Sequence, residues 1–321
     1  MTMATADEEA STTPVRILII NPNTSQHMTA ALVPVVEGLG FPGAQYAFFT
    51  SPTPGIPSIN SPADAARSAD ICLPHLLPLL PHHDCFLVAC YSQHPLVARL
   101  KAECARLTAA ATRGSGGGGA RKYVTGIFEA SVLASLALLG ESEWKPTTGG
   151  EDVSGEPRPA FGIVSTGKVW EEALQNAVQE FLGCPATSTM TAAKSPFVGC
   201  ETTGLNASEL HDLPADEVRR KMMHATKRLL LRGKTDTDTI NSSSTETTTS
   251  RSSPGDTNTD TVLASRVHAI CLGCAGMVGL DSAVRTACVE ALGEDRGKAV
   301  YIVDGVKAGV GALYGLARGG F

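Results

Sequence analysis

The strongest constraint on the fold is a repeated pattern in which a short apolar run ends in a polar loop and a helix-compatible segment follows. Residues 15–20 form a β-branched run of this kind, which stops at the polar segment 21–25. Similar strand candidates recur at 44–50, 84–89, 122–127, 161–165, 198–201, 267–272 and 299–303. Strands that alternate with helices are typical of βαβ units and a parallel sheet. The pattern therefore predicts an α/β fold with about eight strands, divided into two similar halves.

The segments between these runs suit helices. We expect helices at 28–38, 63–80 with interruptions at Pro74 and Pro78, 96–111, 129–140, 168–182, 214–232, from just after Cys274 through Leu292, and 306–317. The glycine-rich segment 113–120 lacks the Lys-Ser/Thr of a phosphate-binding loop and precedes a strand, so we interpret it as a flexible surface loop.

Composition limits both the core and the partners. Charged residues make up 18% of the chain and aromatic residues 5%, so the core is built largely from Ala, Leu, Val and Ile, as in buried parallel strands. The formal net charge is −6, which argues against nucleic acid as a partner. No apolar run reaches the roughly 18 residues that a membrane span needs, and residues 1–14 do not resemble a signal peptide. We expect a soluble, cytoplasmic protein with a disordered tail at 1–14 and a disordered insert at 235–261.

The chain has nine cysteines, an odd number that argues against a disulfide framework and for a reducing compartment. Most of them should be small buried side chains, and we give this interpretation to seven: Cys72, Cys85, Cys104, Cys184, Cys200, Cys271 and Cys288. Cys271 and Cys274 form a single C-x-x-C, without the second pair or the histidines of a zinc site, so we predict no metal. A redox disulfide between these two cysteines is a further hypothesis.

Cys90 and Cys274 differ from the others because each follows an apolar strand and precedes a predicted helix. The positive end of a helix stabilises a thiolate, so this position predicts a lowered thiol pKa. Glycines on both sides of Cys274 let the backbone approach a ligand closely. These two thiols are the candidate catalytic groups.

Small uncharged polar side chains follow several of the predicted strands. Because ligands of open parallel sheets bind at the carboxyl ends of the strands, these side chains predict a site for a small substrate that carries carbonyl groups. Each of them could instead be a simple helix cap. Their coincidence at one edge favours a binding site, and the set comprises Asn21, Asn23, Thr24, Ser25, Thr50, Ser51, Ser92, Ser165, Thr166, Thr202 and Thr203.

Three further side chains are auxiliary candidates. His94 and Gln93 follow Cys90 closely and could assist it, although a histidine before a proline in a loop is more often an incidental polar contact. Glu129 lies near the start of a predicted helix, where it is either a helix-end charge or a site residue. Asp304 is either a turn former or a carboxylate at a strand end.

Six motifs in order resemble the hydantoin racemase branch of the Asp/Glu racemase superfamily, and above all its fungal members that are linked to allantoin metabolism. They are the segments 21–25, 89–92, 125–130, 165–167, 272–277 and 303–306, so the resemblance covers the chain from residue 15 to its end, apart from the insert. It implies two pseudo-symmetric, Rossmann-like α/β lobes, with parallel sheets flanked by helices and the active site in the cleft between them. The first lobe would comprise 15–126 and 303–321, and the second 127–302.

The resemblance also implies a racemase that needs no cofactor and acts as a homo-oligomer on a small-molecule substrate. Carried over residue by residue, Cys90 and Cys274 are its two acid/base groups. The residues expected to bind the substrate are Asn21, Asn23, Thr24, Ser92, Thr166, Thr202, Gly273 and Ala275. Inversion at a carbon next to a carbonyl removes a proton from one face and delivers one to the other, which agrees with two opposed thiols.

One departure from the family pattern affects the substrate. Many hydantoin racemases have an Asp soon after the first cysteine, whereas this chain has Gln93 and His94 there. An Asp/Glu racemase or a maleate-type isomerase of the same superfamily is therefore an alternative to a racemase of 5-substituted hydantoins or allantoin. A non-catalytic sensor that retains the cleft is a third hypothesis.

Overall fold

The computed structural model describes residues 13–115, 121–139, 158–183, 195–234 and 265–321. The predicted tail up to residue 12 and the predicted insert lie outside these ranges, as does Cys184. No helix in the described ranges is long and apolar enough to cross a membrane.

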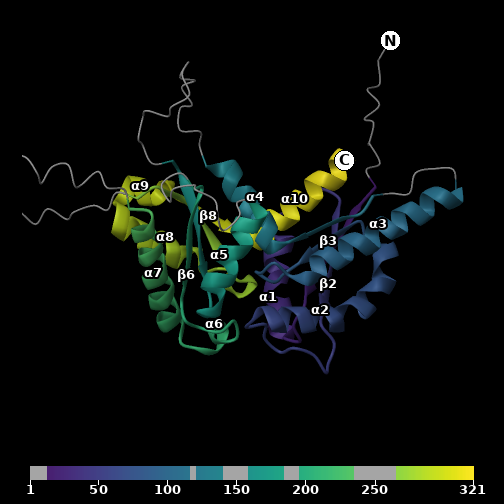
Figure 1. Ribbon diagram of the computed structural model, residues 1–321, viewed down its shortest axis with the longest axis horizontal. Coiled ribbons are helices and arrows are strands. Elements are labelled where there is room, and N and C mark those ends of the chain that lie inside the picture. Colours follow the sequence, from purple (N-terminus) through teal and green to yellow (C-terminus); the bar gives the residue numbers. More distant parts are fainter. Residues whose placement is uncertain (1–12, 116–120, 140–157, 184–194, 235–264) are drawn as a thin grey trace, which may run out of the picture.

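Two four-stranded parallel sheets form the framework of the described residues (Figure 1). The first half contains β1 (Val15–Asn21), α1 (Gln26–Glu37), β2 (Ala44–Thr50), α2 (Pro62–Leu76), the 3-10 helix η1 (Leu77–His82), β3 (Cys85–Val88), α3 (Pro95–Ser115) and β4 (Tyr123–Gly126). The second contains α4 (Ile127–Leu138), β5 (Ala160–Ser165), α5 (Val169–Phe181), β6 (Phe197–Thr202), α6 (Glu209–Asp212), α7 (Ala215–Arg232), β7 (Val267–Gly273), η3 (Ala275–Met277), α8 (Asp281–Leu292), α9 (Glu294–Ala299), β8 (Tyr301–Asp304) and α10 (Gly305–Gly319).

Both sheets have the same strand order. The first is β2-β1-β3-β4 and the second is β6-β5-β7-β8, so in each half the first strand lies between the second and the third. This arrangement confirms the predicted α/β fold with two similar parallel sheets. The lobe boundaries at residues 126 and 303 stay predictions.

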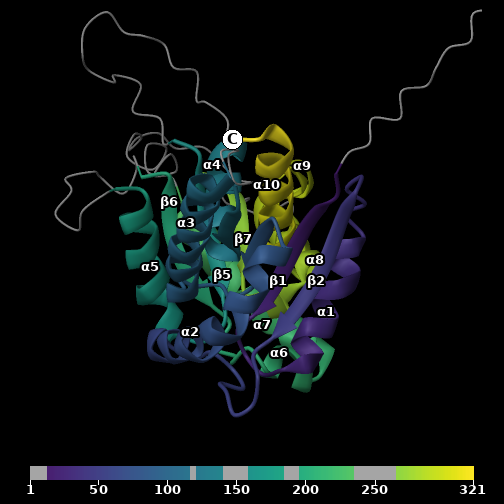
Figure 2. The same ribbon diagram turned by 90° about the vertical axis from the view of Figure 1, so that its right-hand side faces the viewer.

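Alternation along the strands directs the apolar side chains to both faces of each sheet. On β1, Leu18 and Ile20 pack with α2 and α3, whereas Ile17 and Ile19 face a central core that continues to the second sheet. The outer face of the second sheet packs against α7 and α8. Helices α4 and α10 contact each other between the two sheets. In the turned view of Figure 2, the first half lies in front of the second.

Polar caps explain where several helices begin. The Ser25 hydroxyl accepts a hydrogen bond from Met28 N at 3.2 Å, and the Ser61 hydroxyl accepts one from Asp64 N at 3.1 Å. Asp304, for which two interpretations were open, caps α10 by accepting from Val306 N at 2.8 Å.

Three of the expected boundaries were wrong. The helix expected over 63–80 is not interrupted at Pro74 and ends at Leu76. The chain continues as the 3-10 helix η1, which contains Pro81 and Pro78, the second expected interruption. Residues 113–115 belong to α3 and not to a loop, while 116–120 lie outside the described ranges. The segment after Cys274 is the short 3-10 helix η3, and α8 begins only at Asp281, because Gly279 adopts a left-handed conformation with φ 84°.

Candidate active site

Cys90 and Cys274 line one cavity between the two halves of the molecule. Both cysteines are partly exposed, so the cavity is a cleft that opens to solvent. Its walls come mainly from strand ends, loops and first helical turns at the carboxyl ends of strands in both sheets. The lining residues are Asn23, Met28, Ile59, Ala89, Cys90, Tyr91, Thr166, Trp170, Ala207, Gly273, Cys274 and Ala275.

The loop after β3 carries Cys90. Ala89 N donates to Ile20 O at 2.8 Å, which continues the pairing with β1, and the Ser92 hydroxyl lies 3.6 Å from the Cys90 sulfur. The loop is held at its far end by α3, which begins at Pro95. Cys90 therefore lies in a short loop between strand and helix, five residues before the first residue of α3.

Cys274 directly follows β7, where Gly273 pairs with Ser165 of β5. A Cβ at Gly273 would lie 2.8 Å from both the Cβ of Ser165 and the carbonyl oxygen of Val164, so only glycine fits. The Ser165 hydroxyl also donates to Gly273 O at 2.7 Å. The backbone just before Cys274 is thus closely held against β5, which fixes the start of the Cys274 loop.

Burial dominates the ionisation of both thiols. It raises the pKa of Cys90 to about 12, against a lowering by the Ser92 hydroxyl, and the nearby Cys274 and Glu129 raise it further. Burial likewise raises the pKa of Cys274 to about 11, although Gly276 N donates to its sulfur at 3.3 Å. The prediction of lowered pKa values was wrong, because burial desolvates the two thiolates more than the loop amides stabilise them.

Asn23 presents a hydrogen-bond donor to the cavity. Its side-chain oxygen accepts from Ser25 N at 2.9 Å and from the amide of Asn21 at 3.0 Å, so the orientation of the Asn23 amide is fixed. The Asn23 Nδ2 then points to the sulfur of Met28 at 3.4 Å, a weak acceptor. A substrate carbonyl would be a stronger acceptor for this group than the thioether.

The structure brings part of the predicted binding set into the cavity. Asn23, Thr166, Gly273 and Ala275 line it with the two cysteines. Asn21 is buried behind Asn23, and Ser92 is buried beside Cys90.

Two other predicted residues are engaged outside the cavity. The backbone of Thr24 donates to Ile56 O at 2.9 Å, which ties it to the loop after β2. The hydroxyl of Thr202 donates to the Glu171 carboxylate at 2.6 Å.

His94 has a structural position. Its Nδ1 accepts from Leu96 N at 3.2 Å, so it caps the first turn of α3, and its Nε2 lies 3.0 Å from the Ser68 hydroxyl. Burial lowers the pKa of His94 to about 4, which keeps the ring neutral. Gln93 next to it is exposed.

Glu129 lies in the first turn of α4, and its Oε2 is buried without a hydrogen-bond partner in the structure. Burial raises its pKa, and the backbone N–H groups of Glu129 and Gly126 partly oppose this effect. Glu129 does not line the cavity but affects Cys90 electrostatically.

Six lining residues were not among the predicted site residues: Met28, Ile59, Ala89, Tyr91, Trp170 and Ala207. Met28 and Trp170 lie in the first turns of α1 and α5, the helices that follow two predicted strands, and that position was a usable signal. Ile59 and Ala207 lie in longer connections, where the sequence carries no periodicity to place them.

The remaining described cysteines are buried free thiols, in agreement with their predicted packing role. Cys271 points toward α4, where its sulfur lies 3.1 Å from the Ser135 hydroxyl, and both it and Cys274 are free thiols in this structure. The redox hypothesis stays a prediction. Within the described ranges, no group of three or more His, Cys, Asp or Glu side chains could hold a metal ion.

Comparison with known proteins gives the family and the fold. The model of the "Asp/Glu/Hydantoin racemase" family matches residues 17–247. The uncharacterized protein C1F7.10 of Schizosaccharomyces pombe is 28% identical over 304 residues, which covers 95% of this chain and 92% of that protein.

Two solved structures have a similar fold. The allantoin racemase from Klebsiella pneumoniae has a TM-score of 0.58 at 20% identity, over 96% of this chain and 89% of that chain. The allantoin racemase from Pseudomonas fluorescens has the same TM-score at 18% identity, over 96% of this chain and 92% of that chain.

Proposed function

The chain belongs to the Asp/Glu/hydantoin racemase family, and on that premise we propose that it is a cofactor-independent racemase of 5-substituted hydantoins or allantoin. Cys90 and Cys274 are its acid/base pair. The observation that carries the proposal is that the two halves of the molecule each contribute one thiol to a single cavity. Each thiol serves one face of a substrate bound between them.

The reaction moves one proton off and one proton onto the same carbon. A thiolate removes the hydrogen next to the ring carbonyl, the electron pair delocalises onto the carbonyl oxygen, and the opposite thiol delivers its proton to the other face. The reverse direction exchanges the two roles. The enzyme needs one thiolate and one thiol at a time, and mutual repulsion between Cys90 and Cys274 opposes the doubly ionised state.

The substrate carbonyl oxygen gains negative charge during the reaction and needs a hydrogen-bond donor in the cleft. Asn23 Nδ2 is suited to this task because Ser25 N already fixes the orientation of the Asn23 amide. To bind the substrate oxygen, Nδ2 gives up only its weak contact with the Met28 sulfur. Loss of one such donor typically reduces turnover by about 10²-fold or more in other enzymes.

The lining favours a neutral ring over an amino acid or a dicarboxylate. None of the described residues that line the cavity is charged, and Met28, Ile59 and Trp170 form an apolar wall. A free carboxylate would be desolvated there without a cationic partner. The same argument disfavours the alternative of an Asp/Glu racemase or a maleate-type isomerase.

A panel of enantiomers in D₂O tests the proposal. Single enantiomers of allantoin, a 5-substituted hydantoin, Asp and Glu are each incubated with the protein, with protein-free samples as controls. Loss of optical rotation together with deuterium at the stereocentre is expected for allantoin or the hydantoin. Absence of both effects for all four compounds would contradict the proposal, and ligand-induced thermal stabilisation without exchange would favour the sensor.

The cysteine variants identify the groups responsible. Cys90→Ser and Cys274→Ser should each reduce racemisation by about 10²-fold or more, because a serine hydroxyl is a far weaker acid and base partner at this position. The matched control is Cys288→Ser, which changes a buried thiol of α8 that does not line the cavity. Equal losses in all three variants would show that packing and not catalysis is being disturbed.

A further inference from the structure

The two thiol-bearing segments are joined by a buried hydrogen-bonded cluster that the proposed chemistry does not use. Tyr91, the neighbour of Cys90, lies 2.7 Å through its hydroxyl from the hydroxyl of Ser131 on α4. Both residues are buried, and α4 packs against β7 and β8 of the second sheet. This contact therefore connects the Cys90 loop of the first half to the second half.

The direction of the hydrogen bond follows from the available protons. The Ser131 hydroxyl donates its only proton to Phe128 O at 2.9 Å. It can only accept from Tyr91, so the Tyr91 hydroxyl is the donor. Burial raises the pKa of Tyr91 well above its ordinary value, which keeps that proton in place.

The same turn of α4 also holds β7. The thiol of Cys271 lies 3.8 Å from Ser131 O and 3.1 Å from the Ser135 hydroxyl. Cys271 precedes Cys274 by three residues on the same strand and loop. One turn of α4 thus contacts the segment that carries each of the two thiols.

We propose that Tyr91 is a positioning residue, whose hydrogen bond to Ser131 sets the place of the Cys90 sulfur relative to Cys274. The inference rests on the proposed function. Packing alone does not require the hydroxyl, because the Tyr91 ring already makes an edge contact with Phe128 at 5.8 Å between centroids, which a phenylalanine would also make. The hydroxyl adds a directional hydrogen bond between the Cys90 loop and α4.

Loss of this bond should separate two steps that the intact enzyme couples. Without it the Cys90 loop is free to shift, whereas Cys274 stays fixed by Gly273 and β5. Cys274 still removes a proton from the face it serves and, after exchange with solvent, returns a deuteron to the same face. Delivery by Cys90 to the opposite face becomes slow, so hydrogen exchange continues while inversion falls.

The test measures inversion and deuterium exchange together, in D₂O, for the full-length protein with a substrate on which the wild type is active. Tyr91→Phe should lower the ratio of inversion to exchange by about tenfold or more for the enantiomer that Cys274 deprotonates, since displacements near 1 Å cost up to about 10²-fold. KM should stay within a few-fold of the wild type. Ser131→Ala removes the acceptor instead of the donor and should lower the ratio in the same way.

The matched control is Tyr123→Phe, which removes a tyrosine hydroxyl that donates at the exposed surface to Phe321 O at 2.7 Å. It should leave the ratio unchanged. If both Tyr91→Phe and Ser131→Ala keep the wild-type ratio, or if inversion and exchange fall equally, the positioning role is overturned and the proposed function stands. If the wild type shows no exchange with any substrate of the panel, the proposed function is the part that fails.

Discussion

At the scale of single residues, the sequence was sufficient to find the two thiols but not to predict how they ionise. Cys90 and Cys274 were selected because they follow apolar strands, and the cavity does bring them together. The expected lowering of their pKa values assumed that each thiol lies at the start of a helix, but α3 begins only at Pro95, and Cys274 caps only the short 3-10 helix η3. Whether a strand-end thiol is solvated depends on what the opposite half places over it, and a local pattern does not contain that information.

The raised thiol pKa values predict a rate that increases with pH. A thiolate is needed to start the reaction, and burial holds the pKa of Cys90 at about 12 and that of Cys274 at about 11. Below these values each pH unit raises the thiolate fraction about tenfold. kcat/KM should therefore rise continuously from pH 7 to pH 9, when measured in matched buffers of constant ionic strength. A plateau that is already reached at pH 7 would mean that one thiol ionises readily in the free enzyme.

His94 predicts a pH dependence of stability that is separate from catalysis. Its pKa falls from 6.5 to about 4 on folding, so the unfolded chain binds the proton more tightly. The contribution of neutral His94 to the free energy of unfolding is complete above pH 6.5 and is lost as the pH falls toward 4. At pH 5 the loss is about 2 kcal/mol.

The matched variant is His94→Asn, which keeps a side-chain acceptor at the start of α3 but does not titrate. Denaturant unfolding at pH 8 and pH 5 should show a smaller loss of stability at pH 5 for this variant than for the wild type. An identical loss in both proteins would assign the effect to other groups.

At the scale of helices and strands, alternation of apolar runs and helical segments predicted all eight described strands to within two residues at either end. The errors fell where proline and glycine change the local geometry, in η1 and after Cys274. The pattern did not predict which helices and strands contact each other. The position of α4 against the second sheet depends on packing between residues far apart in the chain.

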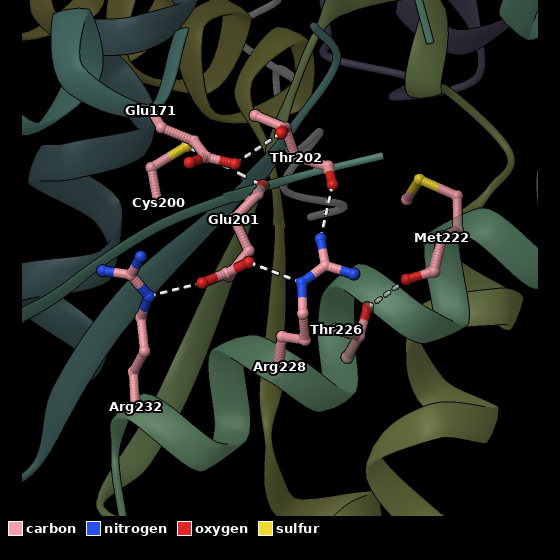
Figure 3. A network of polar contacts seen from close by, with 8 residues as sticks. All are labelled: Glu171, Cys200, Glu201, Thr202, Met222, Thr226, Arg228 and Arg232. Atoms are coloured by element: carbon pink, nitrogen blue, oxygen red, sulfur yellow. Dashed lines mark hydrogen bonds and ion pairs between the residues drawn. The ribbon is translucent and has the colours of Figure 1, made fainter. Parts of the chain in front are cut away.

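One such contact joins β6 to α7 (Figure 3). Glu201, whose side chain is 11% exposed, accepts from Arg228 at 2.7 Å and also pairs with Arg232 one turn later. Arg228 in turn donates to Thr202 O at 2.7 Å, and the Thr202 hydroxyl bonds to Glu171 of α5. The carboxyl end of β6 is thereby tied to helices on both sides.

This network predicts that Glu201→Gln destabilises the fold more than the loss of a surface ion pair does. Because both arginines are about half exposed and remain solvated, the expected cost is only about 1–2 kcal/mol, equivalent to a few degrees in Tm. The matched control is Glu290→Gln, which breaks the exposed pair with Lys227 of the same helix and should cost less than about 0.5 kcal/mol. Thermal unfolding compares the two variants directly. Equal decreases in Tm would show that the burial of Glu201 adds nothing to the stability of the fold.

At the scale of the whole molecule, the site exists only because two sheets of the same topology share a core. Ile17 and Leu87 of the first sheet, Phe128 of α4 and Ile163 of the second sheet belong to one buried cluster. The sequence resemblance implied a cleft between two lobes, and the strand-end set placed several of its residues there. The apolar wall of Met28, Ile59 and Trp170 required both halves to be in position.

The central claim is that each half supplies the acid/base group for one face of the substrate. It is tested most directly by proton NMR in D₂O, with each enantiomer given separately to Cys90→Ser and to Cys274→Ser. The account predicts that neither variant inverts the substrate at an appreciable rate, and that each still exchanges the hydrogen of one enantiomer, a different one for each variant. Exchange of the same enantiomer by both variants, or unimpaired inversion by either, would contradict it.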